Sequence, residues 1–418
     1  IENHIVVKWP AELIPADGRV VLEEGIVGIG ERAFAETPLH HIVFPSTLRT
    51  ISKEAFFGCN RLQAIVVPER TMGESAFEQC HALVGVSLPS TLREIPIKAF
   101  VYCSKLKNVQ LKEGLTLLGE SAFNSCSSLQ KITLPTSIEV IGSDAFKGCI
   151  ALETIIIPEK VTELKDNIFN ECTSLTNVQL PPSIKGIGRS AFYNCTSLKS
   201  IDFPTSLKTI DGLSFYGCKA LTSVEIPEGL QLLGASAFEE CTSLTSVVLR
   251  KGFTELNAKT FKGCKGLKQV VVPDGVTKLA NFVFQYCTQL ESVVLPATLE
   301  SIGLNAFFTC SKLNKVTCNA PIPPTLKGNV FNKTPNGKTL FVPAGSIEQY
   351  KATTNWGAPS FATVTSGVSH VDASTQTQQA NDSRQGIYNL QGVRLGEAEV
   401  FPSLPTGIYV VNGKKLMK

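Results

Sequence analysis

The sequence predicts a solenoid of stacked, β-rich coils, each with one short strand and one short helical turn. The first observation is a spacing: twelve of the thirteen cysteines recur every 23 residues, apart from a first gap of 21. The second is a phenylalanine three residues before each of them, in a series of fourteen from Phe34 to Phe331. A unit this small cannot bury its own apolar edge, so neighbouring units must stack. The twelve cysteines are Cys59, Cys80, Cys103, Cys126, Cys149, Cys172, Cys195, Cys218, Cys241, Cys264, Cys287 and Cys310.

One repeat, from Cys126 to Cys149, reads CSSLQKITLPTSIEVIGSDAFKGC. Residues 129–134 end in alternating apolar and polar residues before a proline, which predicts a short strand that the proline closes. Later in the repeat, Ser143 is a candidate N-cap for a brief helical turn. Such a turn would carry Phe146 and Cys149 inward, because residues three apart share a helix face.

The pattern L-x-x-V-x-L-P, combined with A-F-x-x-C-x-x-L, resembles leucine-rich repeats of the bacterial surface-antigen subclass known as BspA-like or treponemal-type repeats. The resemblance covers residues 20 to about 343. It implies a right-handed, curved solenoid of the α/β horseshoe class, export to the cell surface and a role in adhesion. The asparagine ladder of eukaryotic leucine-rich repeats is absent, so the ligand rules of plant and animal receptors do not transfer.

The rhythm of the repeats also predicts the domain organisation. The repeats are irregular at both ends of the series, as expected of coils that cap an open core. The stretch after the C-terminal cap is polar and has few apolar residues, which is typical of a linker. The last segment alternates like strands and resembles, over about 33 residues, the C-terminal modules of proteins exported by type IX secretion. The predicted parts are an N-terminal cap (1–24), the solenoid (25–315), a C-terminal cap (316–365), a flexible linker (366–385) and a small β-rich tail (386–418).

Composition narrows the class of partner and the location. The net charge is +3, only 18% of residues are charged, and no basic block interrupts the chain. We therefore expect no nucleic-acid partner. No apolar run approaches the ~18 residues of a membrane span. Together with the resemblance, these features predict a monomeric, extracellular or surface-associated protein. The numbering begins at Ile1 rather than Met, so a leader that is not visible here is compatible with export.

The cysteine series has three interpretations. Buried thiols are favoured, because free cysteine behaves as a small apolar residue. Disulfides between adjacent coils remain open, since a strand spacing of ~4.8 Å falls within the permitted Cα range, although side chains in register point the same way. A metal site would need ligands that converge on one point, so neither a metal nor another cofactor is expected. Cys318, outside the series, stands at a strand position and is predicted to be core.

Candidate ligand-binding residues follow the outward position of the predicted strand, between its two inward apolar residues. The middle coils carry polar side chains there and the next three carry valines. An exposed apolar stripe rimmed by polar groups is typical of an interaction site. Coverage by the tail and simple β-propensity are the alternatives. The candidates are Gln179, Asp202, Glu225, Val248, Val271 and Val294.

These features predict a non-enzymatic adhesin-like protein that binds an extracellular protein or glycan through the strand face of the solenoid. One alternative is a surface component that self-associates. Another is a polysaccharide-active enzyme, since Asp202 and Glu225 are predicted neighbours and retaining glycosidases use carboxylates ~5–5.5 Å apart. No catalytic motif and no inserted loop between residues 56 and 316 supports that activity.

Overall fold

The computed structural model comprises two compact units, Ile1–Ala362 and Thr363–Lys418. The predicted linker, 366–385, lies outside the described residues. Those residues are 1–67, 71–356 and 359–364 and, for the backbone alone, the strands at 387–388, 394–396, 408–411 and 414–417.

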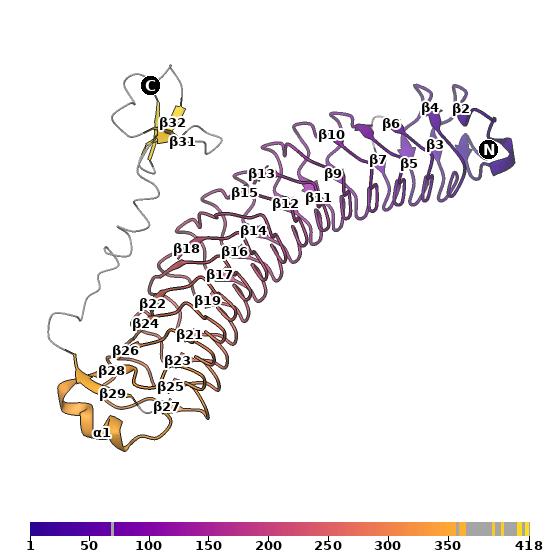
Figure 1. Ribbon diagram of the computed structural model, residues 1–418. Helices are drawn as coiled ribbons and strands as arrows, with labels where there is room; N and C mark the ends of the chain where they lie inside the picture. The colour runs from indigo at the N-terminus through magenta and orange to yellow at the C-terminus, as the bar shows by residue number, and fades with distance from the viewer. Residues whose placement is uncertain are drawn as a thin grey trace. The chain divides into compact units, whose positions relative to one another are not determined.

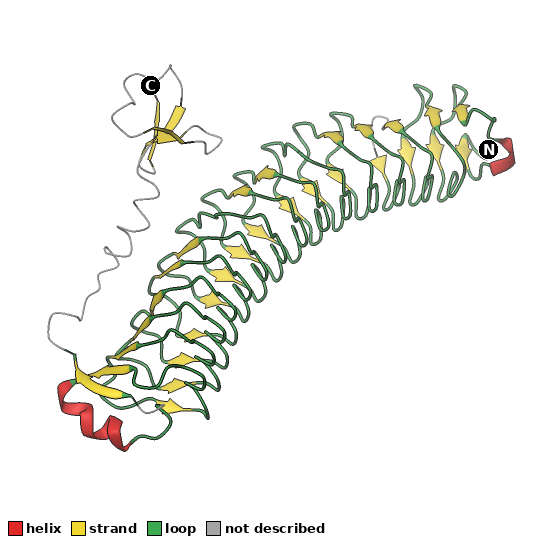
Figure 2. Cartoon of the chain, viewed as in Figure 1, coloured by secondary structure: helices red, strands yellow, loops and turns green. Residues whose placement is uncertain are grey.

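The first unit is a parallel β-solenoid of about 15 coils with about 23 residues each, and it bends into an arc (Figure 1). Loops and turns make up most of each coil, and helix occurs only near the two ends of the described solenoid (Figure 2). The helices are η1 (Ala11–Leu13), η2 (Ala344–Ser346) and α1 (Ile347–Ala352).

The predicted strand of each coil is present in most coils and forms a first set of parallel sheets. Its central residue is buried and aligns with the equivalent residue one coil away, as Ile155 aligns with Val178. Pairing is reduced to a single bridge at Lys131, and residues 200–203 form no strand, so this row is interrupted in the middle coils. The strands are β2 (Arg19–Val21), β4 (His41–Val43), β6 (Ala64–Val66), β8 (Gly85–Ser87), β10 (Asn108–Gln110), β13 (Thr154–Ile156), β15 (Asn177–Gln179), β18 (Ser223–Ile226), β20 (Ser246–Leu249), β22 (Gln269–Val271), β24 (Ser292–Leu295), β26 (Lys315–Cys318) and β28 (Thr339–Val342).

A second set of strands, two residues long, follows the proline-containing corner of each coil. The sequence pattern predicts one strand per coil and gives no sign of this one, because two residues are too few to show an alternating pattern. The bounds are β1 (Ile5–Val6), β3 (Gly28–Ile29), β5 (Thr50–Ile51), β7 (Thr71–Met72), β9 (Glu94–Ile95), β11 (Leu117–Leu118), β12 (Val140–Ile141), β14 (Glu163–Leu164), β16 (Gly186–Ile187), β17 (Thr209–Ile210), β19 (Leu232–Leu233), β21 (Glu255–Leu256), β23 (Lys278–Leu279), β25 (Ser301–Ile302) and β27 (Thr325–Leu326).

The segment around each core phenylalanine is a series of tight turns, where a helical turn was predicted. Residues two before and two after the phenylalanine have left-handed backbone, as at Asp144 (φ 56°) and Gly148 (φ 69°). An α-helix cannot continue through such residues. Backbone N–H groups instead donate to the next coil, as Phe100 N–H does to Ala122 O at 2.9 Å. The turns therefore form a third ladder between coils.

The core contains a continuous stack of aromatic rings along the solenoid. All fourteen repeat phenylalanines take part, with ring centroids 5.0–5.7 Å apart. Trp9 stacks on Phe34 at one end, and Trp356 stacks on Phe331 at the other, at 5.3 and 5.5 Å. Both indole N–H groups are buried without a hydrogen-bond partner. The two tryptophans of the chain thus close the two ends of one stack.

The C-terminal end of the solenoid is covered by α1 and by β29 (Ser360–Thr363), which extends the last first-set sheet. Tyr350 of α1 is fully buried, and its hydroxyl donates to Ala320 O at 2.8 Å and lies 3.1 Å from Cys318 Sγ. The predicted core position of Cys318 is confirmed.

The described strands of the second unit form one four-stranded antiparallel sheet in the order β31-β30-β32-β33. These strands lie within residues 386–418, the segment whose alternation predicted strands. The bounds are β30 (Ile387–Tyr388), β31 (Arg394–Gly396), β32 (Ile408–Val411) and β33 (Lys414–Met417).

Candidate functional site

The cysteines are free and buried, as predicted. Each repeat thiol also donates a hydrogen bond to the carbonyl oxygen of the phenylalanine one coil earlier, as Cys149 Sγ does to Phe123 O at 3.2 Å. Burial raises the pKa of Cys149 to about 12 and that of Cys59 to about 11. These thiols remain protonated near neutral pH, so they are poor nucleophiles and poor metal ligands.

Along the described part of the chain, no three His, Cys, Asp or Glu side chains gather in a way that could hold a metal ion. Within the same residues, no helix has the length and apolar character needed to cross a membrane.

Of the predicted strand-face residues, Glu225 pairs with Val248 and Val271 pairs with Val294 in register on the first set of sheets, and the exposure of the six residues differs. Gln179 at the end of β15 is exposed, and Asp202 is exposed in the segment that forms no strand. Glu225 of β18 accepts a hydrogen bond from Arg250 Nη2 at 2.9 Å and also faces Arg250 Nε at 3.3 Å. Val271 and Val294 are half-buried.

The prediction that Val248 is exposed is wrong, because only 3% of it is accessible. Glu225 is its partner on the neighbouring strand, and Arg250 stands two residues farther along the same face. The ion pair between these two side chains therefore runs beside Val248, while Val271 occupies the equivalent position in the next coil. The stripe of three exposed valines does not exist at this end of the solenoid.

Exposed valines occupy the same outward position at the opposite end. Val21 is 60% and Val66 is 68% exposed, and Val43 between them is half-buried. The sequence pattern is the same at both ends, so the pattern alone cannot separate them. The two ends differ in their neighbouring charges. Glu225 lies opposite Val248 on the adjacent strand and Arg250 follows Val248 by two residues, whereas Val21 has no such pair of opposite charges beside it.

The two carboxylates of the enzyme hypothesis are not arranged as a matched pair. The strand row is broken at Asp202, whereas Glu225 lies within β18 and is held by Arg250. A carboxylate engaged by a guanidinium is held away from a free reacting position. The arrangement offers a surface of mixed polarity.

Comparison with known families adds an independent finding. The sequence profile described as "BspA type Leucine rich repeat region (6 copies)" matches residues 27–153, 139–268 and 232–354. A search of curated proteins found no match.

Among solved structures, a leucine-rich repeat protein from Bacteroides ovatus is 28% identical, with a TM-score of 0.62 over 87% of this chain and 93% of that chain. A leucine-rich repeat protein from Eubacterium ventriosum is 19% identical, with a TM-score of 0.51 over 77% of this chain and 91% of that one. The second likeness concerns the fold alone.

Proposed function

Because this chain belongs to the BspA-type leucine-rich-repeat family, we propose that it is a non-enzymatic, monomeric binding protein of the bacterial cell surface. Its ligand is an extracellular protein or glycan, and the contact surface is the outward row of the first set of strands. The proposed contact residues are Gln179, Asp202, Glu225, Val271 and Val294.

One observation carries this proposal. Core positions repeat the same residue from coil to coil, as the phenylalanines and cysteines do, whereas the outward strand position is polar in some coils and apolar in others. Each coil thus adds one side chain to a surface whose polarity changes along the solenoid, about one strand spacing, ~4.8 Å, from the last. An extended, varied surface suits recognition of a large partner better than it suits catalysis on a small one.

The experiment begins with the purified chain on arrays of glycans and extracellular proteins, to identify a ligand. Val271→Asp is then compared with Leu232→Asp, which places the same charge on the second set of strands, where Leu232 is exposed. We expect Val271→Asp to weaken binding at least tenfold, about 1.4 kcal/mol, and Leu232→Asp to leave it unchanged. Equal binding by both variants, with both folded, would exclude the strand face. Light scattering of the free chain and of the complex measures their masses and so tests whether the protein is a monomer.

A further inference from the structure

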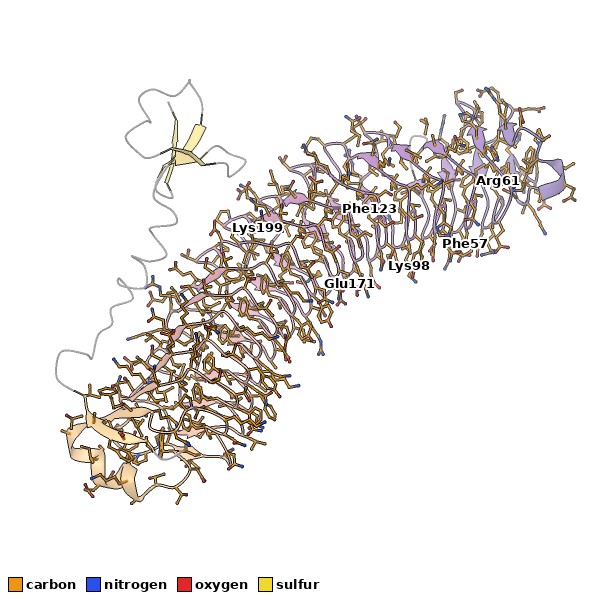
Figure 3. All side chains as sticks on the ribbon, in the orientation of Figure 1. Phe57, Arg61, Lys98, Phe123, Glu171 and Lys199 are labelled. Atoms are coloured by element: carbon orange, nitrogen blue, oxygen red, sulfur yellow. The ribbon has the colours of Figure 1, made fainter. Side chains whose placement is uncertain are left out.

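A second surface runs along the turns that surround each core phenylalanine. It is formed by the residues two before, one after and two after that phenylalanine, and we call it the turn edge. In Figure 3, Lys98, Phe57 and Glu171, which occupy these three positions in other coils, lie along the lower edge of the arc. The ladder of backbone hydrogen bonds holds these positions in register from coil to coil.

Residues 281–287 carry two bulky aromatic residues on this edge, both in left-handed backbone: Phe282 (φ 64°) and Tyr286 (φ 63°). The left-handed conformation costs an ordinary L-residue about 1–2 kcal/mol, and glycine or asparagine adopts it more easily. Tyr286 is also 39% exposed, and Phe282 is half-buried. Left-handed backbone recurs at these two positions along the solenoid, but of the coils with such backbone only this one has an aromatic ring at both. Large rings in costly backbone point to a functional use of this coil.

The next coil extends the aromatic surface. Leu304 is exposed, and the ring of Phe308 meets the ring of Tyr286 edge-on, with centroids 5.7 Å apart. The ammonium of Lys333 lies 5.2 Å from the centroid of Phe308 and covers that ring with positive charge. The open ring of the group is therefore Tyr286.

The preceding coil supplies positive charge. Lysine recurs at every third residue from Lys259 to Lys268. Lys262 is engaged by Glu239, with 2.8 Å between Nζ and Oε1, and this hydrogen bond raises the pKa of Lys262. Among the described residues, Lys259, Lys265 and Lys268 form no ion pair.

Backbone hydrogen bonds place the coil of Lys259 directly beside the aromatic coil. Lys259 N–H donates to Asn281 O at 3.0 Å, next to Phe282. Gly263 N–H donates to Gln285 O at 2.8 Å, next to Tyr286. Lys259 and the exposed ring of Tyr286 therefore belong to adjacent coils of the turn edge, whereas Lys265 and Lys268 lie farther along the chain, after Cys264.

We propose that this part of the turn edge binds an acidic polysaccharide. Aromatic rings offer flat apolar faces to the C–H groups of sugar rings, and the lysines attract carboxylate or sulfate groups. The carboxylate of Glu240 lies among the lysines, beside Gly263. It disfavours nucleic acid, whose backbone in duplex DNA carries a charge every ~1.7 Å, more than it disfavours a chain with one or two charges per disaccharide.

The repeat supplies matched variants for the test. Tyr286→Asn is compared with Tyr102→Asn, because Tyr102 has the same position, a φ of 59° and an exposed side chain. The variant Lys259→Gln is compared with Lys98→Gln, whose lysine occupies the equivalent position in another coil. Asparagine tolerates left-handed backbone, so both tyrosine variants are expected to fold.

The probes are chondroitin sulfate, neutral dextran and single-stranded DNA, with affinities measured at several salt concentrations. We expect chondroitin sulfate to bind, to weaken with added salt and to lose at least tenfold in affinity in the two test variants, with less than a twofold loss in the controls. Absence of binding, equal losses in test and control variants, or tighter binding of dextran or DNA would each overturn the proposal. Val271→Asp is expected to leave chondroitin sulfate binding unchanged, so failure here is separable from failure at the strand face.

Discussion

At the scale of single residues, each repeat cysteine acts as a hydrogen-bond donor as well as an apolar filler. Its thiol donates to a phenylalanine carbonyl one coil earlier, and that oxygen also accepts the backbone N–H of its own coil, as Phe100 O accepts from Cys103 N–H and Cys126 Sγ. Threonine takes the cysteine position in the first and last members of the series, where Thr37 and Thr334 bond to the phenylalanine of their own coil.

The thiols predict that the solenoid loses stability in alkali. Burial raises the pKa of Cys59 from 9.0 to about 11 and that of Cys149 to about 12. The folded state therefore keeps protons that the unfolded chain releases, so stability is full below pH 9 and falls as the pH rises toward those values. Urea unfolding at pH 8, 9 and 10 should show this decline. Above pH 9, Cys149→Ala should reduce the slope of the free energy of unfolding against pH by at most about 1.4 kcal/mol per pH unit. Identical slopes would contradict the assignment.

The thiols should also be unreactive in the native protein. A thiol reagent at neutral pH is expected to modify almost none of them, because they are buried and protonated. After denaturation without reductant it should modify all thirteen. A low count after denaturation would mean that disulfides are present.

Left-handed residues predict a stabilising substitution. Lys98 has a φ of 56° and an exposed side chain, so glycine can replace it without loss of packing. The gain from relieved backbone is about 1–2 kcal/mol, partly offset by the greater entropy of glycine in the unfolded chain. The midpoint of urea unfolding should therefore rise for Lys98→Gly. A fall would show that the lysine makes a contact worth more than the strain.

At the scale of elements, the sequence predicts the inward residues well and the backbone between them poorly. The repeat period places Phe146 and Cys149 in the core, whatever backbone conformation connects them. The helical turn predicted after Ser143 is wrong, because this segment forms tight turns whose backbone N–H groups donate to the next coil. Those hydrogen bonds form only when the coils stack, so the sequence of one coil does not reveal them. Val248 shows the same limit, since an ion pair reaching from another coil decides its exposure.

The aromatic stack makes a further prediction at this scale. Phe146 is fully buried between the rings of Phe123 and Phe169, both 5.7 Å away. Phe146→Ala removes both ring contacts and leaves a cavity, so we expect a loss of ~3–5 kcal/mol in the free energy of unfolding. Phe57→Ala, half-buried on the turn edge, serves as the control and should cost less. Equal losses in the two variants would mean that ring stacking adds little to the free energy of unfolding beyond the burial of apolar area.

At the scale of the whole molecule, coils of the solenoid contact their neighbours, so a local defect should spread only along the stack. Trp9 and Trp356 report the two ends by fluorescence, and Trp9→Phe or Trp356→Phe leaves one reporter. We expect Phe77→Ala to lower the unfolding midpoint seen by Trp9 more than that seen by Trp356. Equal shifts would indicate that all coils unfold as a single unit.

The predicted division into a solenoid and a tail can be tested by limited proteolysis. Residues 366–385 contain few apolar side chains, which predicts that proteases cut first between Ser366 and Gln385. Fragments identified by mass spectrometry should end in this range. First cuts within the solenoid coils would contradict the division.

The equivalence of the coils has a genetic consequence. Unequal recombination between two copies of the repeat, joined at corresponding codons, deletes or adds whole coils and leaves every phenylalanine and cysteine aligned with its neighbours. The shortened interval between Cys59 and Cys80 is two residues below the period, yet Phe56 and Phe77 still stack at 5.3 Å. Length variants of this protein in related strains should therefore differ by multiples of one coil, with irregular intervals confined to the corners and never between a phenylalanine and its cysteine.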